Sequence, residues 1–338
     1  MKFLKKPNRR ITHLIRDARR QSGGAQTILH QIHEHQQRNF YSRIISFTKN
    51  TSPQTNSGIF FITIKTLATL ILNKHDIYII HDRILLIPFL FIRNRKAIFV
   101  CHSTFPDKNY IFRFSSHLRF IAVSEASFLF LKSVNPKILP RLIPNGIPTP
   151  PKEEMRRKAP STEINLGYVG RLSEEKGILD LINAFSKVAF SNQTVKLHLV
   201  GEGPLREFIE TSISASNLSE RIILHGHHPF PFSVLQNINA LVVPSHYEGF
   251  GLVYYEALAR NHVVIASHLP SFKVLPKEKK VFFFPAGDTL QLETLINRFI
   301  EDSIKIDTIE SISPRHTYSS ATKMASKYYD FIGEIENA

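Results

Sequence analysis

The sequence is poor in cysteine, and it has no long uninterrupted apolar run. Cys101 is the single cysteine among 338 residues, which excludes a disulfide framework and a cysteine-based metal site within one chain. The apolar runs 59–72 and 84–92 are shorter than the about 20 residues that are needed to span a bilayer. The basic N-terminus lacks the apolar core of a signal peptide. We therefore expect a soluble or peripheral protein in a reducing cytoplasm.

Acidic residues are scarce in the first part of the chain. Residues 1–150 hold 23 Lys and Arg but 6 Asp and Glu, a balance of +17, whereas residues 151–338 have a balance of −2. Such asymmetry predicts an anionic partner for the first part, and nucleic acid and an anionic membrane surface are both candidates. The chain has no tryptophan and no nucleic-acid recognition motif, so the nucleic-acid interpretation rests on charge alone.

Short apolar runs alternate with helical patterns in the second part of the chain. The runs typical of buried strands are 164–169, 195–200, 222–224, 240–243 and 263–266. This alternation indicates a parallel sheet with helices on both faces. The chain is therefore predicted to be an α/β protein.

A proline-rich segment between residues 139 and 158 indicates a linker. On this basis we predict four parts: an N-terminal Rossmann-like domain at 1–145, a linker at 146–160, a C-terminal Rossmann-like domain at 161–315 and a C-terminal segment at 316–338. The last segment carries apolar residues at helical spacing, which predicts a helix.

The string Pro244–Ala257 follows one of the strand-type runs and combines a glycine-containing turn with the start of a helix. Gly249 and Gly251 flank Phe250, so the backbone can approach a ligand closely. The helical pattern begins near Leu252. A turn of this kind directs N–H groups and the positive end of the helix dipole at an anion, typically phosphate.

Charged residues flank this turn and also occur in one other loop. Glu248 precedes the turn and Glu256 lies on the new helix, so both carboxylates can line one cleft. Arg171 and Lys176 share the loop after the run 164–169, where two cations can hold a diphosphate. For each residue alone, a solvated surface charge is the simpler interpretation.

Two features of the first part can meet the same kind of ligand. Gly23 and Gly24 lie between an apolar run and a helical pattern, an arrangement that can receive phosphate, although a tight turn would also explain them. His102 directly follows a strand-type run, at the carboxyl end where α/β folds bind ligands. A single histidine in such a place is often structural.

Two further segments carry polar residues among apolar ones. His30, His33 and His35 lie on the helix predicted after Gly24, and their spacing favours a solvated helix face over a metal site. The segment Tyr110–Phe120 interleaves aromatic residues with arginines. It is either a core helix with arginines that reach the surface or an amphipathic surface for a membrane.

The segment 145–266 resembles the retaining, nucleotide-sugar-dependent glycosyltransferases of family 4, which have the GT-B fold. The resemblance rests on the string Pro244–Ala257, on the hinge motif 144–147 and on the spacing of the two loop cations. Asn261 and Val263 stand where the family usually has Gly and Pro, and the first 140 residues match more loosely. The resemblance implies two Rossmann-like domains that face a cleft, and a last helix that crosses back onto the first domain.

The resemblance also implies roles for individual residues. The implied catalytic residues are Glu248, Arg171, Lys176 and His102. The implied donor-binding residues are Gly23, Gly24, Gly170, Gly226, Gly249, Phe250, Gly251, Leu252 and Glu256. In the family, Glu248 and His102 contact the donor sugar, Glu256 binds the ribose and the two cations bind the diphosphate. Histidines around Gly226 would lie near the nucleotide base.

The implied reaction transfers a hexose or N-acetylhexosamine from a nucleotide-sugar, with a UDP-sugar favoured. The acceptor would be a lipid-linked glycan, such as a polyprenyl-diphosphate-linked one, or a lipopolysaccharide or capsule glycan. No Asp-x-Asp motif occurs in the chain, so we predict no metal and no cofactor. The loop cations and the helix N-terminus would stabilise the leaving diphosphate. We expect a cytoplasmic protein, peripheral on the inner face of the cell membrane, with no nucleic-acid partner.

Other functions remain open from the sequence. A sugar-nucleotide epimerase or phosphorylase would share the fold, and a nucleic-acid-binding protein would explain the charge. A non-catalytic partner subunit of a transferase normally lacks the diphosphate cations that are present here. The two glutamates also resemble the carboxylate pair of a retaining glycosidase, but neither has an evident acid partner.

Overall fold

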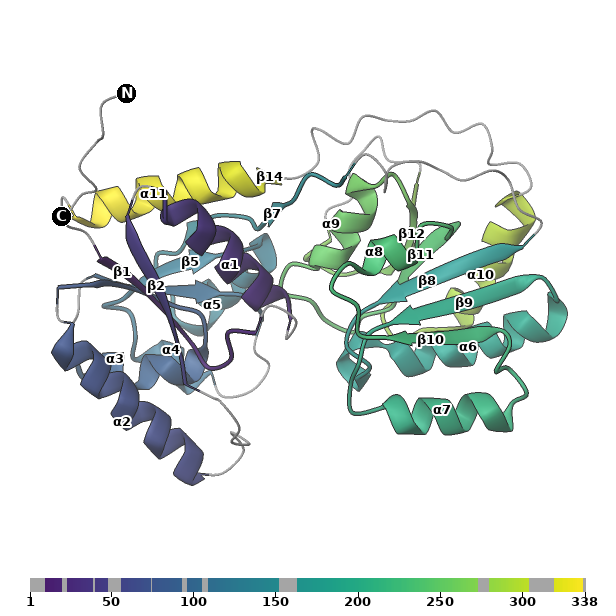
Figure 1. The fold of residues 1–338 in the computed structure, drawn as a ribbon, viewed down its shortest axis with the longest axis horizontal. Coiled ribbons are helices and arrows are strands. Elements are labelled where there is room, and N and C mark those ends of the chain that lie inside the picture. The colour runs from purple at the N-terminus through teal and green to yellow at the C-terminus, as the bar shows by residue number, and fades with distance from the viewer. Residues whose placement is uncertain are drawn as a thin grey trace. The chain divides into compact units, whose positions relative to one another are not determined.

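The computed structural model describes residues 10–19, 23–38, 40–47, 56–73, 75–92, 96–104, 109–151, 163–272, 280–303 and 319–336. The chain divides into two compact units. Unit 1 comprises Met1–Gly146 and Ser319–Ala338, and unit 2 comprises Ile147–Tyr318 (Figure 1). Most of the linker predicted at 146–160 lies outside the described residues.

Unit 1 is a parallel sheet with helices packed against it. Its elements are β1 (Arg10–Ile15), α1 (Gly24–Gln36), β2 (Tyr41–Ser46), α2 (Asn56–Leu72), β3 (Ile77–Ile80), η2 (Arg83–Leu86), α3 (Ile87–Phe91), β4 (Ala97–Cys101), α4 (Tyr110–Arg113), β5 (Arg119–Ala122), α5 (Glu125–Val134), β6 (Arg141–Leu142), β7 (Gly146–Ile147), β14 (Ser319–Ser320) and α11 (Ala321–Glu336). The strand order is β2-β1-β3-β4-β5-β6, so the winding direction reverses between β1 and β3.

The strands of unit 1 form because short apolar runs are buried on both faces. Every residue of β3 and β4 is buried, as expected for parallel strands covered by helices. Ser124 caps the N-terminus of α5: its side chain accepts a hydrogen bond from the N–H of Ser127, and Ser127 Oγ accepts one from the N–H of Ser124.

Unit 2 is also a parallel sheet with helices. Its elements are β8 (Ile164–Val169), η4 (Glu174–Lys176), α6 (Ile178–Ser191), β9 (Val195–Val200), α7 (Arg206–Ala215), β10 (Ile222–Gly226), α8 (Pro231–Val234), β11 (Ala240–Val243), α9 (Leu252–Ala259), β12 (Val263–Ser267), β13 (Val281–Phe284) and α10 (Thr289–Ser303). The order β10-β9-β8-β11-β12-β13 reverses between β8 and β11. The predicted strands of this part of the chain are confirmed, and β13 is an additional one.

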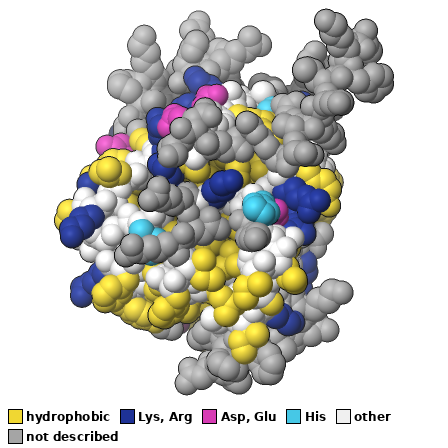
Figure 2. Space-filling model, turned by 90° about the vertical axis from the view of Figure 1, so that its left-hand side faces the viewer, with side chains coloured by type: hydrophobic (Ala, Val, Ile, Leu, Met, Phe, Trp, Pro, Cys, Tyr) yellow, Lys and Arg dark blue, Asp and Glu magenta, His cyan; other side chains and the backbone are white. Residues whose placement is uncertain are grey.

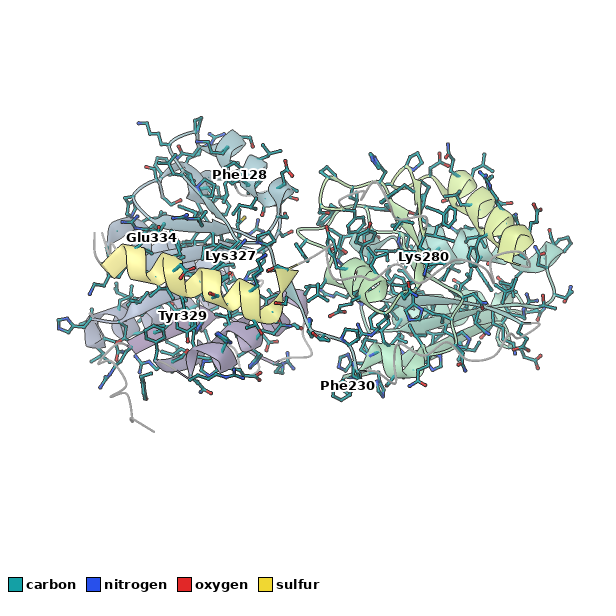
Figure 3. All side chains as sticks on the ribbon, turned by 90° about the horizontal axis from the view of Figure 1, so that it is seen from above. Phe128, Phe230, Lys280, Lys327, Tyr329 and Glu334 are labelled. Atoms are coloured by element: carbon teal, nitrogen blue, oxygen red, sulfur yellow. The ribbon has the colours of Figure 1, made fainter. Side chains whose placement is uncertain are left out.

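The C-terminal helix α11 belongs to unit 1 and packs against α1. The hydroxyl of Tyr329 donates a hydrogen bond to the carbonyl oxygen of His35 (3.1 Å), and its ring stacks on Phe40 at 5.0 Å between centroids. Figure 3 shows α11 across unit 1, with Tyr329 and Glu334 labelled. The hydrogen bond to His35 ties the last segment of the chain to the first helix.

One segment differs from a simple expectation. The segment Tyr110–Phe120 is not one helix: α4 is short, and β5 begins at Arg119. Phe112 and Phe120 are buried in the core, whereas Tyr110 and Phe114 are exposed. The core interpretation is therefore right for half of these aromatics. No helix within the described ranges combines the length and apolarity that crossing a bilayer requires.

Candidate functional site

The two loops at the reversal point of the unit 2 sheet carry most of the predicted site residues of that unit. One loop, 170–177, follows β8, and the other, 244–251, follows β11. The two strands are neighbours, so their carboxyl ends lie side by side. In open parallel sheets, ligands bind outside the carboxyl ends of the strands at such a reversal.

Direct contacts hold these two loops together. The backbone N–H of His246 donates to the carbonyl oxygen of Glu175 at 3.0 Å. Gly177 has a positive φ of 62°, and a Cβ there would lie 2.0 Å from the carbonyl oxygen of Pro244. Only glycine combines this conformation with this close approach. The sequence places glycine at 177 because the two loops touch there.

An ion pair joins the two loops inside the site. Lys176 Nζ lies 2.6 Å from Glu248 Oε1, and the side chains are 28% and 15% exposed. The hydroxyl of Ser245 donates to the same oxygen at 2.9 Å. An ammonium group has three donors, so the bond to Glu248 leaves two for a ligand. The ion pair therefore couples Lys176 of one loop to Glu248 of the other.

Arg171 and Glu175 add charge to the same loop. The side chain of Arg171 is exposed. Burial raises the pKa of the Glu175 carboxyl, but hydrogen bonding and the cations of Arg171 and Lys176 together lower it by more, so the net effect is a lowered pKa. Glu175 therefore stays ionised and balances part of the positive charge of the loop.

Tyr168 holds the start of this loop in place through a hydrogen bond. Its hydroxyl donates to the carbonyl oxygen of Arg171 at 2.7 Å. Burial, followed by the charges of Glu248 and Glu175, raises the pKa of this phenol, so it remains a donor. The sequence analysis missed Tyr168, Glu175 and Ser245. The position of Ser245 inside the string Pro244–Ala257 was the available signal.

Gly170 and Gly226, both predicted donor-binding residues, pack against the loop after β9. A Cβ on Gly201 would lie 1.8 Å from the carbonyl oxygen of Gly170. The N–H of Gly201 donates to the carbonyl oxygen of Gly226 at 2.8 Å. The backbone segments after β8, after β9 and at the end of β10 therefore approach each other at glycines.

The predicted glycine-containing turn and the start of a helix near Leu252 are confirmed at the N-terminus of α9. Gly251 precedes the helix with φ of 81°, and a Cβ there would lie 2.2 Å from the ring of Phe272. Phe250 is buried, and its ring packs on Tyr255 at 4.7 Å. Phe250 therefore contributes packing through its side chain, and only its backbone remains for a ligand.

The remaining predicted residues of this segment are placed by α9 and by the turn before it. Gly249 lies in the turn. Leu252 is the first helical residue, where backbone N–H groups have no partner within the helix. Glu256 lies on α9 and is partly exposed. The chain thus brings Glu248 and the start of α9 into one loop–helix unit.

In unit 1, the predicted residues lie at the start of α1 and directly after β4. Gly23 precedes α1 and Gly24 is its first residue. His102 directly follows β4, and its Nε2 lies 2.8 Å from Nδ1 of His81. Burial lowers the pKa of His102 to about 4, so the imidazole is neutral at neutral pH.

The histidines of α1, expected on a solvated helix face, are half-buried and make contacts within unit 1. His30 Nε2 lies 2.7 Å from the carbonyl oxygen of Ala18, and His33 Nδ1 lies 2.8 Å from Ser42 Oγ. The ring of His35 packs edge-to-face against Tyr329. Across the part of the chain that the structure describes, no group of three or more His, Cys, Asp or Glu side chains could hold a metal ion.

The histidines near Gly226 do not form one group. His225 Nε2 lies 3.0 Å from Nδ1 of His198, whose Nε2 contacts Asn165. This pair lines a cavity of about 390 Å³ over β8, β9 and β10. His228 instead contacts the carbonyl oxygen of Phe230, which Figure 3 labels. The predicted place of these histidines near a nucleotide base stays a prediction.

Comparison with known proteins gives a consistent result for unit 2. Residues 151–316 match the family model "Glycosyl transferases group 1". The capsular polysaccharide biosynthesis glycosyltransferase CapM of Staphylococcus aureus is 30% identical over 159 residues, which are 46% of this chain and 42% of CapM. The lipopolysaccharide 1,6-galactosyltransferase of Escherichia coli is 27% identical over 176 residues, 50% of this chain and 47% of that enzyme.

The structural similarity extends over both units. The crystal structure of Anabaena HepE in complex with UDP-glucose has a TM-score of 0.78 at 18% identity, and the match covers 96% of this chain and 99% of HepE. At this identity the likeness shows the fold, which is GT-B. The chain spans less than half the length of the curated relatives described above.

Proposed function

Unit 2 belongs to the glycosyl transferases group 1 family, and from this premise we propose that the protein is a retaining glycosyltransferase that uses a nucleotide-sugar donor. The observation that carries the proposal is the Lys176–Glu248 pair at the reversal point of the sheet. It combines a cation for a diphosphate with a carboxylate for sugar hydroxyls, next to the N-terminus of α9.

The leaving nucleoside diphosphate gains negative charge as the bond between the sugar and the phosphate oxygen breaks. The two remaining donors of Lys176, the Arg171 guanidinium and the N-terminus of α9 are the groups that stabilise this charge. The acceptor oxygen forms its bond to the same face of the sugar carbon, and its proton passes to the departing phosphate oxygen. This route retains the anomeric configuration and needs no separate base.

Glu248 is oriented for sugar binding by its neighbours. Lys176 and Ser245 both contact Oε1. Oε2 is then the oxygen that accepts hydrogen bonds from the donor sugar. Glu256, on α9, accepts from the ribose hydroxyls.

We propose that catalysis needs no metal, because side-chain cations and a helix terminus supply the positive charge. Full turnover in the presence of excess EDTA is expected. Activity that requires added Mg²⁺ or Mn²⁺ would show that the diphosphate is bound elsewhere.

The donor is a UDP-sugar carrying a hexose or N-acetylhexosamine, and the acceptor is a lipid-linked, lipopolysaccharide or capsule glycan. UDP-glucose is bound in the structure of HepE, whose fold this chain shares. CapM is named for capsular polysaccharide biosynthesis, and the Escherichia coli relative is a lipopolysaccharide galactosyltransferase. These relatives support the class of acceptor.

Unit 1 supplies a surface for an acceptor that is anchored in a membrane. Helices α2 and α3 pack together and expose Ile71, Leu72 and Phe91, which are 67%, 80% and 83% exposed. Figure 2 shows hydrophobic side chains gathered on this end of the molecule, with Lys and Arg around them. We propose that unit 1 docks on the anionic inner face of the cell membrane through these helices.

Two acidic residues of this region are neutralised within unit 1. Asp76 is paired with Arg43 at 2.9 Å, and Asp82 is paired with Arg16. They therefore contribute little repulsion toward an anionic surface.

A thermal-shift panel of UDP-, GDP-, ADP- and CMP-sugars tests the proposed function. Binding to the folded state raises the melting temperature, so the UDP-sugar donor should give the largest shift. No shift with any of them would overturn the proposal. Analysis of the products then separates a transferase from an epimerase, which returns a nucleotide-sugar, and from a phosphorylase, which consumes phosphate.

A further inference from the structure

Three histidines, one within a strand and two directly after strands, form one hydrogen-bonded row in unit 1. His13 Nδ1 lies 3.0 Å from His81 Nε2, and His81 Nδ1 lies 2.8 Å from His102 Nε2. Neighbouring rings are nearly parallel, with interplanar angles of 27° and 22°. Gln36 ends the row on the inner side: its Oε1 lies 2.7 Å from His13 Nε2.

The row runs from the core to the ligand-binding edge of the sheet. His13 lies within β1 and is fully buried, as is Gln36 on α1. His81 follows β3, and His102 follows β4. β1 and β3 are the two strands at the reversal point of this sheet, where parallel α/β folds bind ligands.

The row stays uncharged at neutral pH. Burial lowers the pKa of His13 to about 3 and that of His102 to about 4, and it lowers the pKa of His81 well below 6.5. The neighbouring imidazoles of His33 and His30 lower the pKa of His13 further. A neutral imidazole carries one N–H, so each nitrogen-to-nitrogen contact holds one proton.

The direction of these bonds is set at Gln36. Gln37 Nε2 donates to His33 Nε2 at 3.0 Å, so the Nδ1–H of neutral His33 donates to Ser42 Oγ. The Ser42 hydroxyl in turn donates to Gln36 Oε1 at 3.3 Å. Gln36 therefore presents its carbonyl oxygen to both Ser42 and His13.

One arrangement of protons follows along the row. His13 donates through Nε2–H to Gln36, so its Nδ1 accepts from His81 Nε2–H. His81 Nδ1 then accepts from His102 Nε2–H. The Nδ1 of His102 is left as a hydrogen-bond acceptor, and in the part of the chain that the structure describes no hydrogen bond reaches it.

We propose that Gln36, His13 and His81 are positioning residues that hold His102 in its Nε2–H tautomer, so that its Nδ1 accepts a hydrogen bond from a hydroxyl of the donor sugar. The identity of the ligand rests on the proposed function, but the tautomer does not. An isolated neutral histidine exchanges between two tautomers, and the row removes this freedom before the ligand binds.

Long-range ¹H–¹⁵N correlation spectra of the ligand-free full chain, labelled at histidine, test the proton arrangement directly. At neutral pH, His13, His81 and His102 should each show a protonated Nε2 and an unprotonated Nδ1. Averaged tautomers, or the reverse set with Nδ1–H on all three and the Gln36 amide turned over, would overturn the proposal.

Variants of Gln36 test whether it sets the direction. Gln36→Leu removes the acceptor and should give averaged tautomers at His102, whereas Gln36→Glu keeps an acceptor and should preserve the Nε2–H tautomer. Gln31→Leu is the matched control, because it makes the same change on α1 at a side chain outside the row. If His102 keeps its Nε2–H tautomer in folded Gln36→Leu, Gln36 does not set the direction of the row.

Calorimetry separates this proposal from the proposed function. Gln36→Leu should weaken binding of the nucleotide-sugar about twofold, because averaged tautomers leave about half of the molecules with an acceptor Nδ1, while binding of the nucleoside diphosphate is unchanged. Equal losses for both ligands would overturn the role in sugar binding. If neither ligand binds the wild type, the proposed function fails, and the spectra still decide the tautomer.

Discussion

At the scale of single residues, the Lys176–Glu248 pair makes the most direct prediction. Lys176→Ala removes a charged donor from the leaving diphosphate, and Arg171→Ala removes the other. Each should lower turnover roughly a hundred- to a thousandfold, equivalent to about 3–4 kcal/mol of barrier. Initial rates on folded protein measure this effect.

Lys187→Ala is the control for this measurement. Lys187 lies on α6 of the same unit, and its side chain is 61% exposed, with Nζ 3.3 Å from Glu293 Oε2. Its loss should leave turnover unchanged, because exposed pairs contribute little. Near-wild-type turnover of Lys176→Ala would refute the diphosphate assignment.

Substitutions of the two glutamates should differ in whether they impair sugar transfer or binding of the nucleoside diphosphate. Glu248→Gln should reduce sugar transfer and leave binding of free nucleoside diphosphate nearly unchanged, because we propose that its carboxylate binds the sugar. Glu256→Gln should weaken binding of the nucleoside diphosphate itself, because we propose that it binds the ribose. Titration calorimetry with the diphosphate alone distinguishes them, and equal losses would contradict the assigned roles.

At the scale of elements, the loops after β8 and β11 depend on each other through Gly177. Gly177→Ala places a Cβ 2.0 Å from the carbonyl oxygen of Pro244 at a positive φ. It should destabilise the protein by about 1–3 kcal/mol and reduce activity, because the Lys176–Glu248 contact spans the same loops. Urea denaturation with an activity assay measures both effects.

Gly333→Ala is the matched control for that substitution. Gly333 lies inside α11, and a Cβ there would meet no atom within 4 Å. Alanine should stabilise the helix by about 0.5–1 kcal/mol. Similar destabilisation by both substitutions would show that the contact between the two loops does not cause the loss of stability in Gly177→Ala.

The histidine row predicts how stability depends on pH. His13, His81 and His102 have pKa values below 6.5 in the folded state, so the unfolded state binds more protons as pH falls. Stability is therefore retained above about pH 6.5 and decreases toward about pH 4, by about 1.4 kcal/mol for each group per unit difference in pKa.

Urea denaturation across this pH range tests whether the three histidines of the row cause this dependence of stability on pH. His75→Gln, at an exposed side chain outside the row, should retain the same pH dependence. His13→Gln should reduce it if the variant folds. A free energy of unfolding that does not change between about pH 7 and pH 5 would contradict the buried neutral state.

At the scale of the whole molecule, the charge asymmetry predicts membrane docking through unit 1. The protein should float with vesicles that contain phosphatidylglycerol and less with neutral ones. Each cation near the surface contributes about 1 kcal/mol, and salt screens the attraction over about 10 Å at 0.1 M. Release by salt is therefore expected.

Two phenylalanines provide a matched pair for this assay. Phe91→Ser, on α3 of unit 1, should weaken flotation, whereas Phe190→Ser, on α6 of unit 2, should not. Both side chains are more than 80% exposed, so neither change opens a core cavity. Retention on DNA without binding to anionic vesicles would assign the charge to nucleic acid instead.

The sequence by itself determined the class of fold and the loops of the candidate site. β8, β9 and β11 have the predicted bounds, because each is a short apolar run between polar or glycine-containing turns. Gly251 and the start of α9 were predictable for the same local reason. The mixed composition of β2 and α10 gave no such signal, and the sequence analysis missed both.

Only the tertiary structure decided which side chains meet. Lys176 and Glu248 are 72 positions apart, and the order of β8 and β11 in the sheet brings them together. His13, His81 and His102 come from three strands, and the sequence analysis singled out one of them. Periodicity is encoded in neighbouring residues, whereas strand order and side-chain contacts arise from packing of the whole sheet, which no single segment encodes.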